Sequence, residues 1–190
     1  MAEALGAGLT GPYRQQIDGL RAIAVMGVLY THFWDEGTAW GTLGVRLFFV
    51  ISGYLITGIL LAARENAGNG KPQALASFYI RRGLRIWPIY FLTLAVAAVA
   101  STAFWPALPW HATFLSNLYF MREGEWRPWP TAHLWSLSVE EQFYLIWPLL
   151  VLFAPRRTLP AIFIATIGIA IAYRATISLF WPQLDFPNIA

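Results

Sequence analysis

Five long apolar segments constrain this chain more than any other feature. They lie at about 17–34, 43–63, 78–103, 134–154 and 159–180. A helix needs about 20 mostly apolar residues to cross a bilayer, and each segment approaches or exceeds that length. Membrane-spanning strands would alternate polar and apolar residues, and these segments do not. The sequence therefore predicts an all-α, polytopic transmembrane helix bundle with about five spanning helices.

The composition agrees with a membrane protein. Charged residues make up 12% of the chain, which is about half their share in a soluble domain. Ten Trp and eight Tyr suit the interface between bilayer and water. The lack of cysteine excludes disulfides, thiolate metal sites and a cysteine nucleophile. We expect no metal site, and because no basic run is present, we expect no nucleic-acid partner.

Loop charges predict the orientation. Six loop cations would lie on one side of the membrane: Arg64, Lys71, Arg81, Arg82, Arg156 and Arg157. The other side has only Arg122 and Arg127 in its loops. Because cytoplasmic loops are rich in Lys and Arg, we expect a cytoplasmic N-terminal tail at 1–16, a membrane domain at 17–181 and a short external tail at 182–190. The loop at 104–133, rich in Trp and Pro, is then predicted to lie on the outer membrane surface.

The first apolar segment carries ionisable residues, which are costly inside a membrane and usually functional. Arg21 and His32 are eleven residues apart. Eleven helical steps bring them back to one face, about 16 Å apart along the axis. Asp18 joins this face one turn before Arg21. Alternatively, Arg21 and His32 could each extend from one end of the helix to the nearer membrane interface. Because they share a face, we favour a polar seam through the protein.

Two further charged pairs lie in the third and fourth segments. Arg82 and Arg85 are one turn apart and can hold a phosphate together, although the excess of positive charge in cytoplasmic loops by itself explains Arg82. Glu140 and Glu141 begin the fourth segment, at the level of His32 in the predicted orientation. A carboxylate beside an imidazole can orient it, whereas acids at a helix N-terminus are also common. Because neighbouring residues cannot share a face, we expect at most one glutamate to point inward.

Smaller features predict contacts between segments. Gln142 lies deep enough in the fourth segment to hydrogen-bond a neighbouring helix, and Asn117 is a candidate polar contact in the outer loop. The Ser52-Gly53 pair in the second segment predicts a close approach of two helices, which we favour over a catalytic serine.

Four strings, in this order, resemble the acyltransferase 3 family: IDGLRAIAVMGVLYTHF, GVRLFFVISGYLITGIL, FYIRRGLRIWPIYF and HLWSLSVEEQFYLIWPLL. This family consists of bacterial membrane-bound O-acyltransferases that modify cell-surface and secreted carbohydrates and some antibiotics. The resemblance covers most of residues 17–153. It is much more specific than any single motif.

The resemblance also implies a site and its substrates. The family's arginine and histidine eleven residues apart match Arg21 and His32, and its arginine pair matches Arg82 and Arg85. Its serine/glutamate motif matches the stretch from Ser136 to Glu141, in which Ser136 and Ser138 are substrate-binding candidates. It implies an acyl-CoA donor substrate, generally acetyl-CoA, that binds from the cytoplasm, and no permanently bound cofactor. The acceptor would be a carbohydrate or lipid-linked sugar hydroxyl near the outer face of a bacterial inner (plasma) membrane.

The hypothesis is acyl transfer across the membrane. His32 would act as the general base or as the nucleophile, oriented by Glu140 or Glu141, while Arg82 and Arg85 hold the donor phosphates. Family members typically have about twice as many spanning helices, so we expect this chain to be the N-terminal half, without its C-terminal half or a partner subunit. A transporter or flippase with a His–Glu–Arg seam, or an inactive structural half of a larger protein, fits the same residues.

Overall fold

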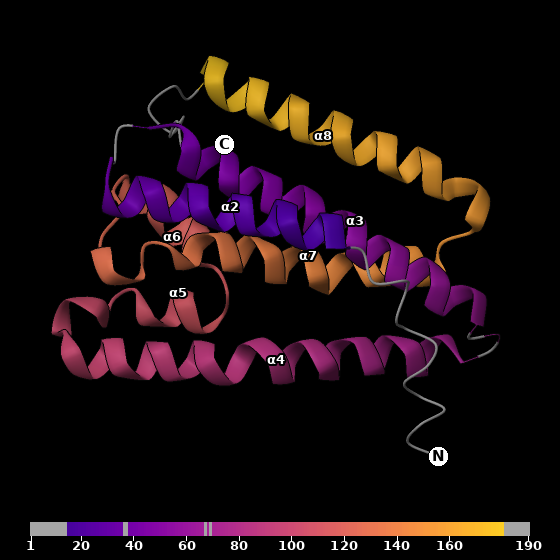
Figure 1. Ribbon diagram of the computed structural model, residues 1–190, viewed down its shortest axis with the longest axis horizontal. Coiled ribbons are helices and arrows are strands. Elements are labelled where there is room, and N and C mark those ends of the chain that lie inside the picture. Colours follow the sequence, from indigo (N-terminus) through magenta and orange to yellow (C-terminus); the bar gives the residue numbers. More distant parts are fainter. Residues whose placement is uncertain (1–14, 36–37, 67, 69, 181–190) are drawn as a thin grey trace. The chain divides into compact units, whose positions relative to one another are not determined.

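The computed structural model describes residues 15–35, 38–66, 68 and 70–180 (Figure 1). All regular structure within these ranges is helical, which confirms the all-α class. Four helical segments are long and apolar enough to cross a membrane: α3 (Trp40–Asn66), α4 (Lys71–Ala100), α7 (Leu134–Phe153), and Arg156–Phe180, which contains α8 (Leu159–Phe180). The first predicted span, α2 (Gln15–Phe33), forms a helix but is not one of the four. Most of the predicted tails, 1–14 and 182–190, lies outside the described residues.

The predicted bounds agree with the helices within three residues, with one exception. Helix α4 begins at Lys71, seven residues before the predicted start at 78. The polar residues ahead of the apolar run thus belong to the same helix. Arg82 consequently lies about 16 Å along the axis from the first residue of α4, so it is well inside the helix.

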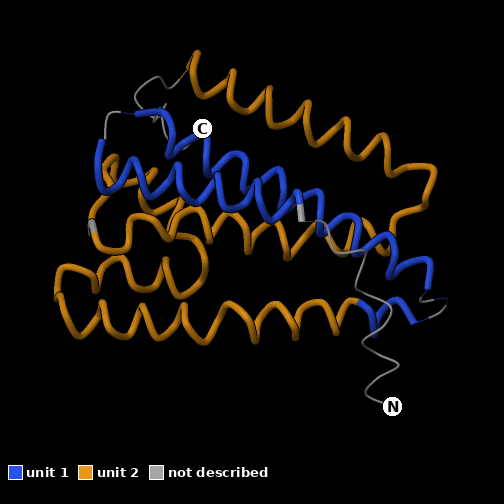
Figure 2. The backbone as a smooth tube through the Cα atoms, viewed as in Figure 1, with its two compact units in different colours: residues 1–74 blue, residues 75–190 orange. Residues whose placement is uncertain are grey.

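The chain consists of two compact units, residues 1–74 and 75–190 (Figure 2). In unit 1, α2 packs closely against α3. A Cβ on Gly27 would come 2.9 Å from the carbonyl oxygen of Trp40, and one on Gly44 would overlap the carbonyl oxygen of Ala24. Of the pair Ser52-Gly53, at which a close approach was predicted, Ser52 is buried, whereas a Cβ on Gly53 would meet nothing within 4 Å. The two helices therefore approach closely at Gly27 of α2 and Gly44 of α3, each of which lies against the backbone of the other helix.

In unit 2, the residues between α4 and α7 fold into a compact group of short helices, which we call the cap (101–133). It contains η1 (Thr102–Phe104), α5 (Leu108–Ala112), α6 (Ser116–Glu123) and η2 (Trp129–Thr131). Phe104 and Ala107 of the cap form one buried cluster with Tyr90 and Leu94 of α4 and Leu134 of α7. The predicted outer loop is therefore a folded element that is fixed to the ends of two long helices.

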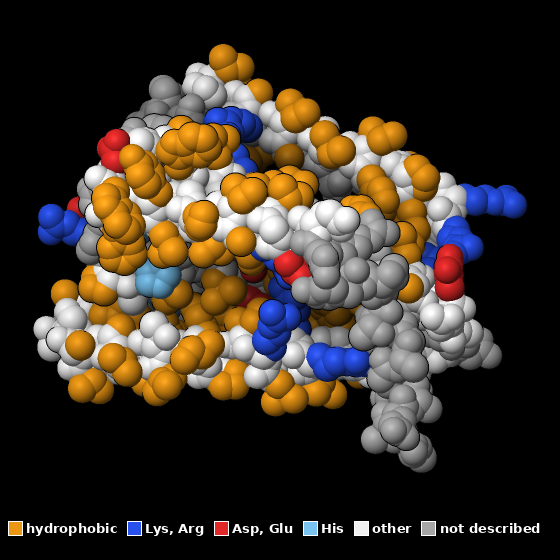
Figure 3. Space-filling view, in the orientation of Figure 1, with side chains coloured by type: hydrophobic (Ala, Val, Ile, Leu, Met, Phe, Trp, Pro, Cys, Tyr) orange, Lys and Arg blue, Asp and Glu red, His pale blue; other side chains and the backbone are white. Residues whose placement is uncertain are grey.

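After α7, the described part of unit 2 continues with a short turn of helix, η3 (Arg156–Thr158), and then α8. The ring of Trp147 on α7 stacks on that of Phe163 on α8, with centroids 5.2 Å apart. Hydrophobic side chains cover much of the visible surface of α4 and α8 (Figure 3). Such surfaces suit helices that face lipid, because a bilayer offers no hydrogen-bond partners.

Candidate functional site

The arginine and histidine predicted on the first helix lie on α2 in unit 1. Because α2 is continuous from Gln15 to Phe33, Arg21 and His32 share a face as expected. The guanidinium of Arg21 lies over the ring of Phe48 on α3, 5.8 Å from its centroid. Its Nε is buried without a hydrogen bond, whereas Asp18, one turn earlier, is exposed.

The imidazole of His32 has a defined hydrogen bond. Its Nδ1 lies 2.9 Å from the carbonyl oxygen of Val28, one turn earlier on α2. A carbonyl oxygen can only accept, so Nδ1 carries the hydrogen. In the neutral ring, Nε2 then has a free lone pair. This tautomer is the one that a general base at Nε2 requires.

The arginine predicted to bind phosphate lies among aromatic and acidic groups of unit 2. Arg82 on α4 is half-buried, and its Cζ lies 3.4 Å from the ring centroid of Tyr144 on α7. Its Nε is buried without a hydrogen bond. The Arg82 charge is within electrostatic range of Glu140, Glu141 and Arg85. Arg85 itself is exposed.

Both predicted glutamates turn toward the protein, contrary to the expectation that only one would. Glu140 is 8% exposed. Glu141 accepts a hydrogen bond at Oε2 from the indole Nε1 of Trp87 on α4, at 3.2 Å. The other oxygen of Glu141, Oε1, is buried without a hydrogen bond. Because α4 lies beside α7, its long indole side chain reaches the flank of α7 that Glu141 occupies.

These contacts bring Arg82 and the two glutamates into one cluster. The predicted positions were far apart, with Arg82 near the cytoplasmic end of its helix and the glutamates near the external end of theirs. The earlier start of α4 explains the difference, because it places Arg82 deeper in the helix. Pairing of a glutamate with His32, which lies in the other unit, stays a prediction.

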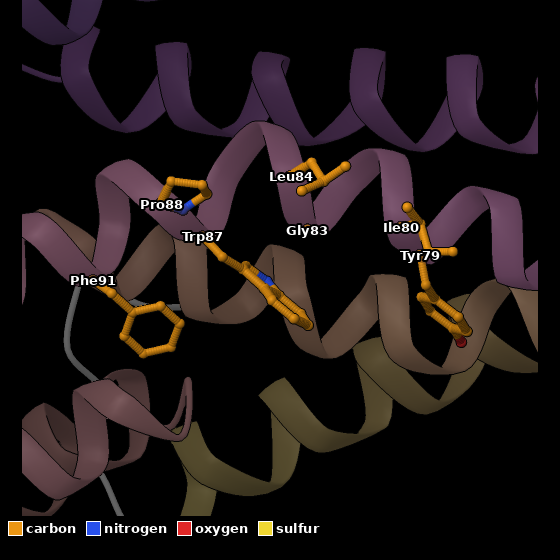
Figure 4. A pocket seen from close by; sticks show the side chains of 7 residues that line it. All are labelled: Tyr79, Ile80, Gly83, Leu84, Trp87, Pro88 and Phe91. Atoms are coloured by element: carbon orange, nitrogen blue, oxygen red, sulfur yellow. The ribbon is translucent and has the colours of Figure 1, made fainter.

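An apolar groove of about 510 Å³ runs along α4 beside this cluster. Figure 4 shows the rings of Tyr79, Trp87 and Phe91 projecting from α4 along it, with Gly83 between the first two. A Cβ on Gly83 would lie 3.3 Å from the Trp87 ring. Trp87 is thus both a wall of the groove and the hydrogen-bond donor to Glu141.

The two candidate serines make local contacts. Ser138 is fully buried, and its hydroxyl lies 2.7 Å from that of Ser116 in the cap. Ser136 donates to the carbonyl oxygen of His133 at 3.1 Å. Ser138 therefore connects α7 to the cap, and Ser136 bonds the backbone just before its own helix.

Gln142 forms the predicted polar contact between helices. Its Nε2 donates to Oδ1 of Asn117 on α6 at 2.9 Å and to the carbonyl oxygen of Phe114 at 2.8 Å. Phe114 has a φ of +56°, a conformation that is strained for a residue with a side chain. Its ring stacks on Tyr90 with centroids 4.6 Å apart. Gln142 and Tyr90 together hold this turn of the cap in place.

No role was predicted for His111, which is fully buried in the cap. Its Nδ1 donates to the carbonyl oxygen of Ala107 at 2.9 Å, and its ring lies against those of Phe104 and Phe120. Burial in this aromatic environment lowers the pKa of His111 below its usual value of 6.5 and outweighs the opposing effect of nearby carbonyl groups. A lone histidine in an irregular loop carries no periodicity from which burial could be predicted.

Sequence reasoning also missed the aromatic partners Trp87 and Tyr144. Tyr144 lies four residues after Glu140 on α7, a spacing that places both on one face, and this signal was available. The link from Trp87 to Glu141 had no signal, because it depends on how α4 lies beside α7. Within the described residues, no three His, Asp or Glu side chains come together in a way that could hold a metal ion.

Comparisons with known proteins agree on one family. A family model described as an acyltransferase domain matches residues 14–189. The peptidoglycan O-acetyltransferase OatA of Listeria monocytogenes serovar 1/2a (strain EGD-e) is 39% identical over 155 residues, covering 72% of this chain and 24% of the relative. The O-acetyltransferase OatA of Staphylococcus aureus (strain NCTC 8325) is 34% identical over 170 residues, covering 83% and 28%. A putative O-acetyltransferase of S. aureus (strain MSSA476) is 35% identical over 159 residues, covering 73% and 24%.

This chain spans about a quarter of the length of the curated relatives that it matches. No solved structure matches it.

Proposed function

Because this chain belongs to the acyltransferase 3 family, we propose that it forms part of a multi-pass membrane enzyme that moves an acetyl group from acyl-CoA to a carbohydrate hydroxyl. The relatives named O-acetyltransferases support transfer of an acetyl group to oxygen. The Listeria relative is named for peptidoglycan, and we propose peptidoglycan or a related cell-surface carbohydrate as the acceptor. The enzyme would lie in a bacterial plasma membrane with its N-terminus in the cytoplasm.

The observation that carries this proposal is the tautomer of His32. Its Nδ1–H is committed to the Val28 carbonyl oxygen, so Nε2 of the neutral ring is free to accept a proton. A histidine in this state, on a helix that also carries a half-buried arginine, suits general-base activation of a hydroxyl.

The proposed step balances as follows. The acceptor hydroxyl gives its proton to Nε2 of His32 while its oxygen attacks the thioester carbonyl. The new O–C bond forms and the C–S bond breaks, and the departing sulfur takes the proton from the imidazolium. The products are an acetyl ester and free coenzyme A, and His32 returns to its neutral form. Exclusion of water by the surrounding helices would limit hydrolysis of the thioester.

Arg82 and Arg85 would hold the phosphates of the donor. Their charges are close enough to interact, and guanidinium groups bind phosphate through paired N–H donors. Glu140 or Glu141 would balance the charge of the His32 imidazolium, while the Val28 carbonyl oxygen, which accepts from Nδ1–H, orients the ring. Replacing each glutamate separately by Gln and measuring transfer identifies the one that fulfils this role.

Donor binding is the first test. We expect the detergent-purified chain to bind radiolabelled acetyl-CoA, and the Arg82→Ala/Arg85→Ala variant to lose that binding. An Arg156→Ala/Arg157→Ala variant is the matched control, because it removes two adjacent arginines that lie outside the cluster. A folded wild-type chain that binds no acetyl-CoA contradicts a donor site in this chain and favours a transporter or structural half, which needs no acyl-CoA.

Catalysis is the second test. His32→Ala should keep the fold and acetyl-CoA binding but lose release of free coenzyme A in the presence of peptidoglycan fragments. The His111→Gln variant is the control, because His111 lies in the cap and has no place in the proposed step. Turnover by His32→Ala at the wild-type rate would rule out the general-base role.

A further inference from the structure

We propose that Trp87 and Tyr144 are positioning residues that hold Glu141 and Arg82 apart. One buried polar atom of each charged group, Oε1 of Glu141 and Nε of Arg82, then keeps no hydrogen bond within the protein and can bind a substrate. We call Trp87 and Tyr144 the aromatic clamp. The inference rests on the proposed function, in which Arg82 and one glutamate serve acyl transfer. It adds two residues to that site, neither of which bears a formal charge.

Tyr144 fixes the plane of the Arg82 guanidinium. The Cζ of Arg82 lies 3.4 Å from the ring centroid, so the ring covers one face of the cation. Such contacts are attractive because the ring face is electron-rich. The N–H donors of a guanidinium lie in its plane and point away from its edges. The ring thus covers one face of Arg82 and not its edges, where Nε is buried and has no hydrogen bond.

Trp87 fixes the carboxylate of Glu141. Its indole N–H donates to Oε2 at 3.2 Å, while Oε1 is buried without a hydrogen bond. An indole has one donor and no acceptor, so it holds one oxygen and cannot satisfy the other. The ring of Trp87 lies beside Gly83, where a Cβ would come within 3.3 Å of it.

Arg82 and Glu141 are close but do not bond to each other. Their charges interact, yet no ion pair joins these two described side chains. Opposite charges attract strongly away from bulk water, and buried polar atoms without partners are costly. Without the clamp, the two side chains would satisfy each other. We infer that the open guanidinium edge receives an anionic or carbonyl oxygen of the donor, and that the open carboxylate oxygen receives a proton-bearing group.

The clamp predicts that activity and stability respond differently to substitution. Trp87→Phe removes only the indole donor, and Tyr144→Leu removes the ring face while keeping an apolar side chain. Each variant allows Arg82 and Glu141 to pair directly. We expect a fall in kcat of about tenfold or more, the equivalent of one charge-assisted hydrogen bond, with the melting temperature unchanged or raised.

Three controls separate this role from a general packing role. Tyr144→Phe keeps the ring and should retain activity within about twofold, since a factor of two is a small part of one hydrogen bond. Trp105→Phe removes an indole hydrogen bond in the cap, to the Ala98 carbonyl oxygen at 3.0 Å, and should leave kcat unchanged. In a Glu141→Gln background, Trp87→Phe should have little further effect, because the carboxylate that it positions is gone.

The assay is acetyl-CoA-dependent release of coenzyme A with peptidoglycan fragments as acceptor, together with thermal melting of each variant in detergent. Lower kcat with an unchanged or higher melting temperature supports the clamp. Wild-type kcat in Trp87→Phe and Tyr144→Leu, or losses of activity that follow losses of folded protein, overturn it. A wild-type chain that neither binds nor uses acetyl-CoA refutes the proposed function instead, so the two failures are distinguishable.

Discussion

Replacing Gly83 by Ala adds one methyl group beside the clamp. The new Cβ would lie 3.3 Å from two atoms of the Trp87 ring, whereas carbon atoms in favourable contact are about 3.5–4.0 Å apart. The ring must therefore shift by a few tenths of an ångström. The hydrogen bond from Trp87 to Glu141 is already 3.2 Å long, the upper end of the usual range. A small displacement of the ring is enough to break it.

Stability should then change little, whereas activity should fall. Gly→Ala inside a helix gains about 0.8–1.0 kcal/mol, which offsets much of the packing cost, so we expect a melting temperature close to that of the wild type. Loss of a hydrogen bond to a charged group is worth about 1.5–3 kcal/mol. If that energy orients Glu141 for the reaction, kcat falls by about tenfold to a hundredfold.

The assay is coenzyme A release by Gly83→Ala and by the control Gly168→Ala, with melting curves for both. A Cβ on Gly168, in the interior of α8, would meet nothing within 4 Å, so this control gains helix propensity without a clash and should keep full activity. Transfer by Gly83→Ala within about twofold of the wild-type rate would refute the reasoning, because it would show that the position of the Trp87 ring does not matter.

Three further substitutions test the packing of each unit. Ser116→Ala should cost about 1–3 kcal/mol, because it leaves the buried hydroxyl of Ser138 without its partner, and adding Ser138→Ala should cost much less than a second such loss; melting curves of the single and double variants test this. Gly44→Ala should destabilise unit 1 by about 1–3 kcal/mol through overpacking, whereas Gly58→Ala, whose Cβ meets nothing within 4 Å, should not, as measured by the yield of folded protein. Because the pKa of His111 is lowered below 6.5 in the fold, unfolding takes up a proton at acidic pH. The contribution of neutral His111 to stability is therefore fully present above about pH 6.5 and is lost as the pH falls toward the pKa of His111 in the fold. In the His111→Gln variant, the melting temperature measured over that pH interval should depend less on pH than in the wild type.

The sequence predicted the long helices well because their signal is local. Apolar length alone placed α7 and α8 within one residue of their observed ends. It failed at the start of α4, where polar residues after Lys71 continue the helix beyond the apolar run. Hydropathy indicates which residues can lie in the hydrocarbon core of the bilayer. A helix can continue beyond that core, as α4 does at its start.

Side-chain contacts between helices were predictable only where chemistry restricted the partners. Gln142, a half-buried amide within an apolar helix, needed a hydrogen bond, and Asn117 supplies it. Gly53 meets no neighbour although Ser52 beside it is buried, because small residues permit a close approach without specifying which face another helix covers. The close approach of α2 and α3 at Gly27 and Gly44 became evident only from the packed helices.

The sequence by itself determined that the chain is helical and membrane-spanning, and it nominated Arg21, His32, Arg82 and the two glutamates as ionisable residues in unfavourable surroundings. Only the tertiary structure showed that Trp87 reaches Glu141 and that the guanidinium of Arg82 lies against an aromatic ring. The physical reason is geometric. A shift of one residue along a helix moves a side chain by about 1.5 Å and rotates it by about 100°. The partners of a buried charge therefore depend on the register and rotation of two helices, which periodicity within either one does not specify.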